Sequence, residues 1–366
     1  MSQLDIGKVV KEAIDKAKTE TGNINILIAG KTGVGKSTLI NAVFQGNYAT
    51  TGQGKPVTKS TREIKKEGIP LTLFDTRGME VSEFETTYSQ LEELVKERSK
   101  RKNPDEHIHA AWVCIDESSR RIEDAEIQLT KMLASYIPVL GVITKAQADR
   151  GFRAIVFEHL KDVKNIIRVN SIDETLDDGY VIKKFGLQEL VEATMEIVPE
   201  GQHRAFAASQ KVSIDIKKKT AHKIVVSAAG IAGSIGATPI PFSDAVALVP
   251  VQVTMLAGIT SVFGFTLEEG FLKTLIASVI TGSGATLIGR SIASNLLKFI
   301  PGVGSVAGGI ISAGTAAAVT TAFGEAYIQT LAHLLVKKDM KDITQTDILT
   351  ELKKRFKGKK NNVETN

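Results

Sequence analysis

The stretch GKTGVGKS at residues 30–37 decides the fold of this chain. It matches the complete pattern G-x-x-x-x-G-K-[ST] of a phosphate-binding loop. The apolar, β-branched run at residues 25–29 predicts a buried strand before the loop, and residues 38–44 have helical spacing after it. A strand, a glycine-rich loop and a helix in this order predict a P-loop that binds a nucleoside triphosphate.

Each residue type in this loop has a chemical role in holding phosphate. Glycines let the backbone N–H groups wrap the phosphate oxygens, and the helix that follows adds the positive end of its dipole. Lys36 is expected to contact the β- and γ-phosphates, and the Ser37 hydroxyl is expected to bind Mg²⁺. The predicted nucleotide contacts in this segment are Gly30, Thr32, Gly33, Val34, Gly35, Lys36, Ser37 and Thr38.

A second motif, LTLFDTRG at residues 71–78, predicts another buried strand that ends in D-x-x-G. At these positions an aspartate holds Mg²⁺ through water and a glycine N–H senses the γ-phosphate, which gives these roles to Asp75 and Gly78. The polar segment between the two motifs contains two threonines that can close over Mg²⁺. Thr61 is our first choice as the ligand, because it comes just before Arg62 and the expected strand at residues 63–64. Thr58 is a close second, since spacing does not separate the two.

The segment after the apolar run at residues 138–144 is the candidate for base recognition. GTP-binding proteins usually carry [NT]-K-x-D here, and Thr144 and Lys145 fit that pattern. Gln147 stands where the aspartate is expected, and Asp149 comes two residues later. Either Asp149 reaches the base through a bulged loop, or the specificity for guanine is relaxed.

Asn170 and Ser171 follow the last expected strand and are predicted to contact the base. Together these motifs resemble those of Era-like and septin- or Toc-like GTPases of the TRAFAC class, over about residues 23–198. The resemblance implies an α/β fold, a P-loop GTPase domain with a mostly parallel sheet and flanking helices, that binds GTP or GDP with Mg²⁺. ATP is the alternative ligand, because a P-loop does not discriminate between bases. The implied metal ligands are Ser37, Thr61 and Asp75.

Met79 follows D-x-x-G at the position where Ras-like enzymes have a glutamine that orients the attacking water. A methionine cannot orient water, so we expect slow intrinsic hydrolysis of GTP to GDP. By resemblance, GTPases with a hydrophobic residue here complete the site with another group, often through a homodimer across the nucleotide face. The predicted catalytic residues of this chain are Lys36, Thr61 and Gly78.

A length of 366 residues predicts more than one domain. The amphipathic N-terminal helix is expected to dock onto the protein's own helices, because its aliphatic stripe is short and has no aromatic anchor. The expected parts are this helix at 1–22, a GTPase domain at 23–199, a charged linker helix at 200–222, an all-α hydrophobic domain at 223–335 and a basic tail at 336–366.

Four nearly charge-free segments lie between residues 224 and 324. A bilayer-spanning helix needs about twenty apolar residues, and three of the four reach that length. They are rich in small residues, and the G-x-x-x-G at residues 304–308 fits close helix packing in lipid or in a tight bundle. Two interpretations stay open: hydrophobic hairpins at a membrane, which we favour, and a bundle packed against the GTPase domain. The basic cluster at residues 351–360 could contact an anionic leaflet.

The stretch at residues 237–264 resembles the YcjF-type domain of unknown function, over about residues 222–335. That domain is often joined to bacterial GTPase domains and is regarded as membrane-associated. The joined architecture is also similar to that of immunity-related and dynamin-like GTPases, in which a helical domain responds to nucleotide. We expect a cytoplasmic protein that associates with a membrane on its cytoplasmic side, and the basic cluster makes an anionic membrane the expected partner.

Charge and cysteine content limit the remaining functions. A formal net charge of +5 is too small to indicate nucleic-acid binding, and we identify no RNA-binding module. The single cysteine, Cys114, lies in an apolar run and predicts a core thiol in a reducing compartment, and no secretory signal is expected at the N-terminus. The alternative functions are a nucleotide-dependent regulatory scaffold with little turnover, and an Era-like RNA or ribosome assembly factor.

Overall fold

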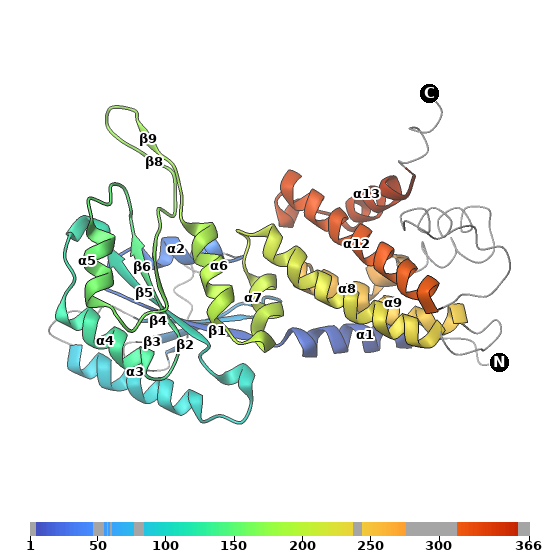
Figure 1. Cartoon of the computed structure of the whole chain (residues 1–366), viewed down its shortest axis with the longest axis horizontal. Coiled ribbons are helices and arrows are strands. Elements are labelled where there is room, and N and C mark those ends of the chain that lie inside the picture. Colours follow the sequence, from blue (N-terminus) through green and yellow to red (C-terminus); the bar gives the residue numbers. More distant parts are fainter. Residues whose placement is uncertain are drawn as a thin grey trace. The chain divides into compact units, whose positions relative to one another are not determined.

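The computed structural model divides the chain into two compact units (Figure 1). Gly22–Ser213 form the first, which we call the sheet unit, and Met1–Thr21 with Ile214–Asn366 form the second, the helical unit. The residues that the structure describes are 5–46, 55–56, 58, 61–76, 84–236, 244–275 and 313–357.

The sheet unit is built on a seven-stranded sheet in the order β2-β3-β4-β1-β5-β6-β7. β1 pairs in parallel with β4 and β5, β6 and β7 continue the parallel sheet, and β3 and β2 form an antiparallel edge. The mostly parallel sheet with flanking helices confirms the predicted fold class. The strands are β1 Ile24–Ala29, β2 Lys55–Pro56, β3 Thr61–Lys65, β4 Leu71–Thr76, β5 Ala110–Asp116, β6 Val139–Thr144 and β7 Asn165–Arg168.

Helices cover both faces of this sheet (Figure 1). Because helices bury both faces, the central strands are continuous apolar runs rather than alternating ones. The helices are α2 Lys36–Val43, α3 Phe84–Ser99, α4 Asp124–Ala134, α5 Phe152–His159, α6 Leu187–Ile197 and α7 His203–Ser209, with short 3₁₀ turns η2 Pro104–Glu106, η3 Glu117–Ser119 and η4 Glu200–Gln202. A small hairpin, β8 Glu174–Thr175 and β9 Val181–Ile182, extends from the sheet unit beyond β7.

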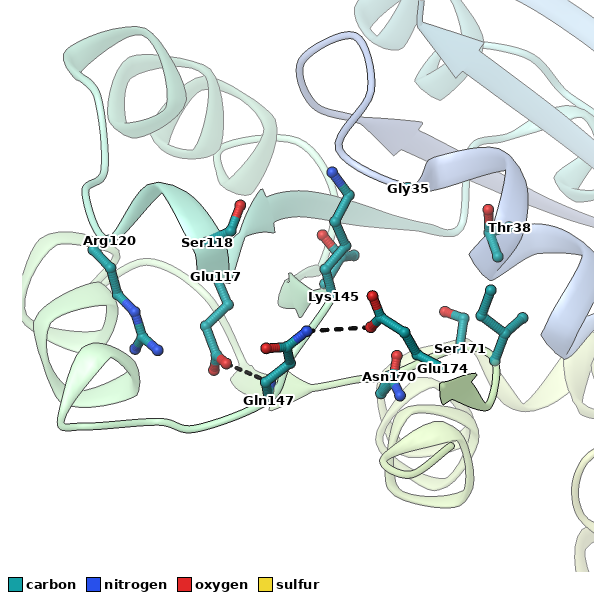
Figure 2. Close-up of a pocket in the computed structure, with 12 residues that line it drawn as sticks. Gly35, Thr38, Glu117, Ser118, Arg120, Lys145, Gln147, Asn170, Ser171 and Glu174 are labelled. Carbon is teal, nitrogen blue, oxygen red and sulfur yellow. Dashed lines mark hydrogen bonds between the residues drawn. The ribbon is translucent and has the colours of Figure 1, made fainter. Parts of the chain in front are cut away.

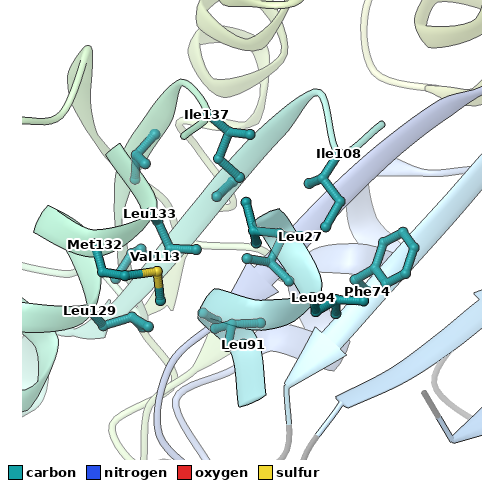
Figure 3. Packing of buried hydrophobic residues seen from close by; sticks show 14 residues of the cluster. Leu27, Phe74, Leu91, Leu94, Ile108, Val113, Leu129, Met132, Leu133 and Ile137 are labelled. Atoms are coloured by element: carbon teal, nitrogen blue, oxygen red, sulfur yellow. The ribbon is translucent and has the colours of Figure 1, made fainter. Parts of the chain in front are cut away.

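The core on one face of the sheet lies beneath α3 and α4, where apolar side chains of both helices interdigitate with those of β1, β4 and β5 (Figure 3). On the opposite face the fully buried Trp112 stacks on Phe44 with ring centroids 5.5 Å apart. The Trp112 indole N–H donates to Thr194 Oγ1 at 3.1 Å, so this large side chain has a polar partner. These two layers hold the strands whose carboxyl ends carry the predicted motifs.

Residues 200–222 do not form the single charged linker helix that composition predicted. They form η4, α7 and the first turns of α8, Ile214–Gly236. Gln210 ends α7: its side-chain oxygen accepts hydrogen bonds from the amides of Val212 and Ser213 at 2.8 and 2.7 Å. Phe206 is fully buried in the sheet unit, so the residues before Ser213 complete that unit.

The helical unit contains α1 Ile6–Thr21, α8, α9 Asp244–Phe263, α12 Ala313–Lys337, η5 Met340–Asp342 and α13 Gln345–Lys357. The apolar stripe of α1, which includes Val10 and Ile14, is buried. α1 packs on α9, and the Thr21 and Ser261 hydroxyls lie 2.7 Å apart. The expectation that this helix docks onto the protein's own helices is confirmed.

α8, α9 and α12 approach one another closely. Gly324 on α12 allows this approach, because a Cβ there would lie 2.6 Å from Val225 and 2.9 Å from Met255. The buried hydroxyls of Thr260 and Tyr327 lie 2.8 Å apart between α9 and α12. No helix within the described residues is long and apolar enough to cross a bilayer. Most of the charge-free run at residues 274–289, the G-x-x-x-G at 304–308 and the end of the basic tail lie outside the described residues.

Candidate nucleotide-binding site

The GKTGVGKS stretch forms a loop between β1 and α2, as its pattern predicts. Gly30, Gly33 and Gly35 all have positive φ angles, of 146°, 77° and 99°. Gly30 has a second requirement for glycine, because a Cβ there would lie 2.6 Å from the carbonyl oxygen of Cys114. The backbone therefore turns sharply over the end of β5 and enters α2 at Lys36.

Lys36 is the first residue of α2 and is only 9% exposed. Its ammonium donates to the carbonyls of Gly30 and Lys31, at 2.6 and 2.9 Å, so the side chain folds back along the loop. Burial lowers the pKa of Lys36, and the nearby negative charge of Asp75 opposes that shift. A phosphate group in the loop would add the negative charge that this buried cation lacks.

Asp75 lies near the end of β4, and its Oδ1 is buried with no hydrogen-bond partner among the residues that the structure describes. Burial raises the pKa of this carboxyl, although Lys36 and Arg62 act in the opposite direction. Such an unpartnered oxygen fits Mg²⁺, which binds hard oxygen ligands and usually takes only one or two from the protein beside phosphate and water. Ser37 is exposed at the start of α2 and can supply a hydroxyl.

Thr61 is placed differently from Asp75. The register pairs Thr61 with Thr76 and Arg62 with Asp75 across β3 and β4. Because paired residues share a face and neighbours alternate, the Thr61 and Asp75 side chains lie on opposite faces of the sheet. The structure does not bring these two predicted metal ligands together. Thr58 precedes β3 and accepts a hydrogen bond from the Thr61 amide at 2.9 Å.

The predicted residues Gly78 and Met79 lie outside the described residues.

A cavity of about 390 Å³ opens beside the end of the P-loop (Figure 2). The carboxyl ends of β5, β6 and β7 meet the start of α2 there, which is where open α/β sheets bind ligands. Six of the predicted site residues line it: Gly35, Thr38, Thr144, Lys145, Asn170 and Ser171. The others that line it are Glu117, Ser118, Arg120, Gln147, Ile172 and Glu174.

Thr144 connects the two halves of the site. Its hydroxyl donates to the Val34 carbonyl in the P-loop at 2.6 Å and lies 3.0 Å from the Ile115 carbonyl at the end of β5. Lys145 follows with a left-handed backbone, φ 49°, and its ammonium pairs with Asp116 at 2.7 Å. The Lys145 stem is thereby held beside the cavity, with its charge turned to the Asp116 carboxylate.

Asp149 does not line the cavity. Its Oδ1 accepts a hydrogen bond from the Arg153 amide at 2.8 Å and lies 3.5 Å from the Arg168 guanidinium. Its carbonyl accepts from the Phe152 amide at 2.8 Å and from Arg120 at 2.7 Å. These contacts engage Asp149 in the turn that starts α5, whereas Gln147 faces the cavity.

Two carboxylates at the cavity were not singled out from the sequence, Glu117 and Glu174. Glu117 is 1% exposed and accepts hydrogen bonds from Arg168 at 2.8 Å and from the Gln147 amide at 2.5 Å. Glu174 begins the β8–β9 hairpin and accepts one from Gln147 Nε2 at 3.2 Å. The Asp178-Gly179 pair at the tip of that hairpin is a turn signal that could have revealed it, and Gly179 has φ 81°.

Cys114 lies on β5 beneath the P-loop and is fully buried. Burial raises the pKa of its thiol to about 12. A thiol with so high a pKa is a poor nucleophile at neutral pH, which agrees with the core position predicted from the sequence.

Two family descriptions match parts of the chain. Residues 25–145 match "50S ribosome-binding GTPase", and residues 202–357 match a domain of unknown function, DUF697. Similar solved structures include a probable GTP-binding protein engB, at 17% identity and a TM-score of 0.34, with 47% of this chain and 97% of that chain covered.

Three curated relatives match about half of the chain. The tRNA modification GTPase MnmE of Alkaliphilus metalliredigens (strain QYMF) is 28% identical over 206 residues, which cover 54% of this chain and 39% of that protein. Septin-9 of Mus musculus is 25% identical over 211 residues, covering 49% and 36%. The probable GTP-binding protein EngB of Oenococcus oeni (strain ATCC BAA-331 / PSU-1) is 26% identical over 191 residues, covering 50% and 91%. The chain thus spans well under half the length of the first two relatives.

Proposed function

Because the chain joins a TRAFAC-type P-loop GTPase domain to a C-terminal DUF697 domain, we propose that it hydrolyses GTP to GDP with Mg²⁺ and couples the nucleotide state to its helical unit. The observation that carries this proposal is the cavity beside the P-loop, lined by Gly35 and by the segments that follow β5, β6 and β7. In this arrangement the P-loop would bind the phosphates, and the cavity would hold the base.

In this proposal the P-loop amides and Lys36 bind the phosphates. The Lys36 ammonium lies against the carbonyls of Gly30 and Lys31, within the loop that would hold the phosphates. Ser37 and Asp75 would hold Mg²⁺, which when bound neutralises the charge that develops on the phosphate oxygens. The β3–β4 register counts against Thr61 as the threonine that closes over the metal, because Thr61 lies on the face opposite Asp75. Thr58 is then the remaining candidate. Gly78 would sense the γ-phosphate.

The Lys145 stem and the loop at Asn170 and Ser171 would flank the base in the cavity. This part of the proposal accounts for the Lys145–Asp116 ion pair, which fixes the stem where a purine ring would stack. The ring would then present its Watson–Crick edge toward Gln147 and Glu174, whose side chains are hydrogen-bonded to each other at 3.2 Å beside the cavity (Figure 2).

Competition against a labelled guanine nucleotide tests the ligand. In the presence of Mg²⁺, GTP and GDP should displace the label at concentrations at least 100-fold lower than ATP. Equal displacement by ATP would refute guanine specificity. Displacement by neither would refute nucleotide binding altogether.

Turnover tests the enzymatic part of the proposal. Met79 cannot orient water, so the rate in dilute protein should be low and should rise with protein concentration if a homodimer completes the site. A rate per molecule that stays flat from nanomolar to micromolar protein would contradict self-activation. Stoichiometric binding with no turnover at any concentration would favour the scaffold function instead.

We also propose that the helical unit acts at an anionic membrane on the cytoplasmic side. The sequence supports this with its charge-free segments and with the basic cluster at residues 351–360. Two apolar side chains of α8, Val226 and Ile231, are about half exposed, at 56% and 49%. The full chain should float with vesicles containing phosphatidylserine, and high salt should weaken the association without abolishing it. Failure to float with GTP, with GDP and without nucleotide would refute the membrane partner and leave the GTPase proposal intact.

A further inference from the structure

The cavity lacks a carboxylate at the position where the [NT]-K-x-D pattern places one, because Gln147 occupies it. The Watson–Crick edge of guanine presents two adjacent donors, N1–H and the N2 amino group. A carboxylate accepts both, whereas an amide offers one accepting oxygen beside a donating NH₂ group. Gln147 alone therefore does not match the edge of guanine.

Three nearby carboxylates are already engaged. Asp149 accepts from the Arg153 amide at 2.8 Å and lies outside the cavity lining. Glu117 is buried and bonded to Arg168 and to the Gln147 backbone. Asp116 pairs with Lys145 and accepts from Ser118 at 2.8 Å. Each would have to break a charged or buried contact to reach a base.

We propose that Glu174 is the residue that reads N1–H and the N2 amino group of guanine, and that Gln147 is its positioning residue. The inference rests on the proposed function, because it assigns a role within the guanine site. Glu174 is exposed and lines the cavity, and its Oε2 accepts from Gln147 Nε2 at 3.2 Å. It makes no other hydrogen bond and no ion pair with the residues that the structure describes. Figure 2 shows the two side chains directed toward each other.

The hairpin that carries Glu174 is anchored at its base. Asn170 and Phe185 exchange two backbone hydrogen bonds, of 3.1 and 3.0 Å, and Glu174 pairs with Ile182 across β8 and β9. Gly186 follows Phe185 where the chain leaves the hairpin. Only glycine fits there, because a Cβ would overlap the Arg168 carbonyl. The backbone of Glu174 is thus held beside the cavity. The side-chain NH₂ group of Gln147 adds one hydrogen bond to the Glu174 carboxylate and leaves most of its lone pairs available.

Purine diphosphates that differ at C2 test this assignment. Hypoxanthine lacks the N2 amino group, and xanthine has an accepting oxygen in its place. The full chain should bind GDP about 10- to 100-fold more tightly than IDP, because a hydrogen bond to a charged group is lost. Glu174→Gln should weaken the binding of GDP by about 10- to 100-fold. The ratio of the affinities for GDP and IDP, here called the GDP-to-IDP ratio, should fall to near 1, and the affinity for XDP should rise relative to that for GDP.

Three further variants make the test specific. Asp177→Asn removes a charge from the same hairpin and should leave the GDP-to-IDP ratio unchanged. Asp149→Asn should also leave that ratio unchanged. Gln147→Asp in the Glu174→Gln background places a carboxylate where the common pattern has one and should restore the ratio.

The outcomes separate the two proposals. A wild-type GDP-to-IDP ratio near 1, or a ratio lost in Asp149→Asn and kept in Glu174→Gln, would overturn the assignment of Glu174 while guanine-nucleotide binding stands. A wild-type chain that binds no guanine nucleotide, or in which ADP competes as well as GDP, would instead overturn the proposed function.

Discussion

Each of the two units contains a buried lysine, and their surroundings differ. Lys36 in the sheet unit lies against two loop carbonyls and near Asp75, at the edge of a site. Lys217 in the helical unit is 1% exposed within a helix-lined interior, and its ammonium donates to the carbonyl of Phe263 at 3.2 Å. Burial lowers the pKa of Lys217 to about 7.

The two lysines therefore differ in what their charge can interact with. Lys36 lies where a ligand can bind, and Lys217 lies at the end of a helix. Phe263 is the last residue of α9, and Gly264 after it has φ 84°, so Lys217 supplies a cation at a helix C-terminus. Lys36 lies at a helix N-terminus, where a cation is unfavourable unless an anion joins it. We therefore expect substitution of Lys36 to change binding and substitution of Lys217 to change stability.

The largest effect is expected at the P-loop. Lys36→Ala should lower the affinity for GTP by about 100-fold or more, because it deletes the cation that faces the phosphates. Lys31→Ala is the matched control, since its side chain pairs with Glu123 and should change affinity less than about threefold. Isothermal titration with GTP and Mg²⁺ measures both. Equal losses in the two variants would show that general charge, rather than the position of Lys36, carries the binding.

The second prediction concerns the pH dependence of stability in the helical unit. The folded pKa of Lys217, about 7, lies below its ordinary value of 10.5, so the unfolded state binds more protons between these values. The free energy of unfolding should therefore rise as pH increases from 7 to 10. Lys217→Met should remove this contribution and raise the free energy of unfolding at pH 7 by on the order of 1–3 kcal/mol.

Denaturant unfolding followed by circular dichroism at pH 7, 8 and 9 measures this effect. Lys218→Met is the control, because Lys218 is only partly buried and pairs with Asp215 at 3.3 Å. A Lys217→Met protein that is less stable at pH 7 and keeps the wild-type slope would show that the bond to Phe263 outweighs the cost of the buried charge.

The third prediction moves to a neutral contact in the sheet unit. Thr194→Val removes the acceptor of the Trp112 indole N–H and leaves that donor buried, which should cost about 1–2 kcal/mol of unfolding free energy. The fluorescence of Trp112, the single tryptophan of the chain, follows unfolding of this unit directly. Thr175→Val on the exposed hairpin should be neutral. A neutral Thr194→Val would mean that stacking on Phe44, not the hydrogen bond, holds the indole.

The smallest effect is expected for the corresponding pair in the helical unit. Tyr327→Phe removes one hydroxyl, but the Thr260 hydroxyl keeps its bond to the Leu256 carbonyl at 2.7 Å. Because no buried donor is left without a partner, the loss should be about 0.5–1 kcal/mol. Thermal unfolding by circular dichroism measures it. A loss larger than that of Thr194→Val would indicate that the helical unit depends more strongly on its polar contacts than the sheet unit does.

The sequence was sufficient for the P-loop and the central strands, because their signals are local. An apolar run followed by glycines and a helix has few alternative structures, and residues 25–29, 71–76 and 139–144 all lie in strands. The docking of the amphipathic helix was also predictable, because its apolar stripe is short and has no aromatic anchor. In each of these regions, the sequence pattern that predicts the structure spans no more than about twenty consecutive residues.

Strand register and loop geometry were not available from spacing. Thr61 was the first choice as the switch threonine, yet pairing with Thr76 turns its side chain to the face opposite Asp75. Glu174 faces Gln147, which lies 27 residues away in the sequence, because a hairpin folds back beside the cavity. Tertiary pairing decides both positions, and a single sequence contains no direct record of it.

The buried thiol of Cys114, under the P-loop, is a built-in probe of local opening in the sheet unit. With a pKa of about 12 and no exposure in the folded state, it can react with an alkylating reagent only when β5 and the loop above it separate. The labelling rate therefore measures how often this part of the sheet opens, and it reports local opening where it exceeds the rate of global unfolding. Since the chain has a single cysteine, that rate can be read on the unmodified protein by mass spectrometry.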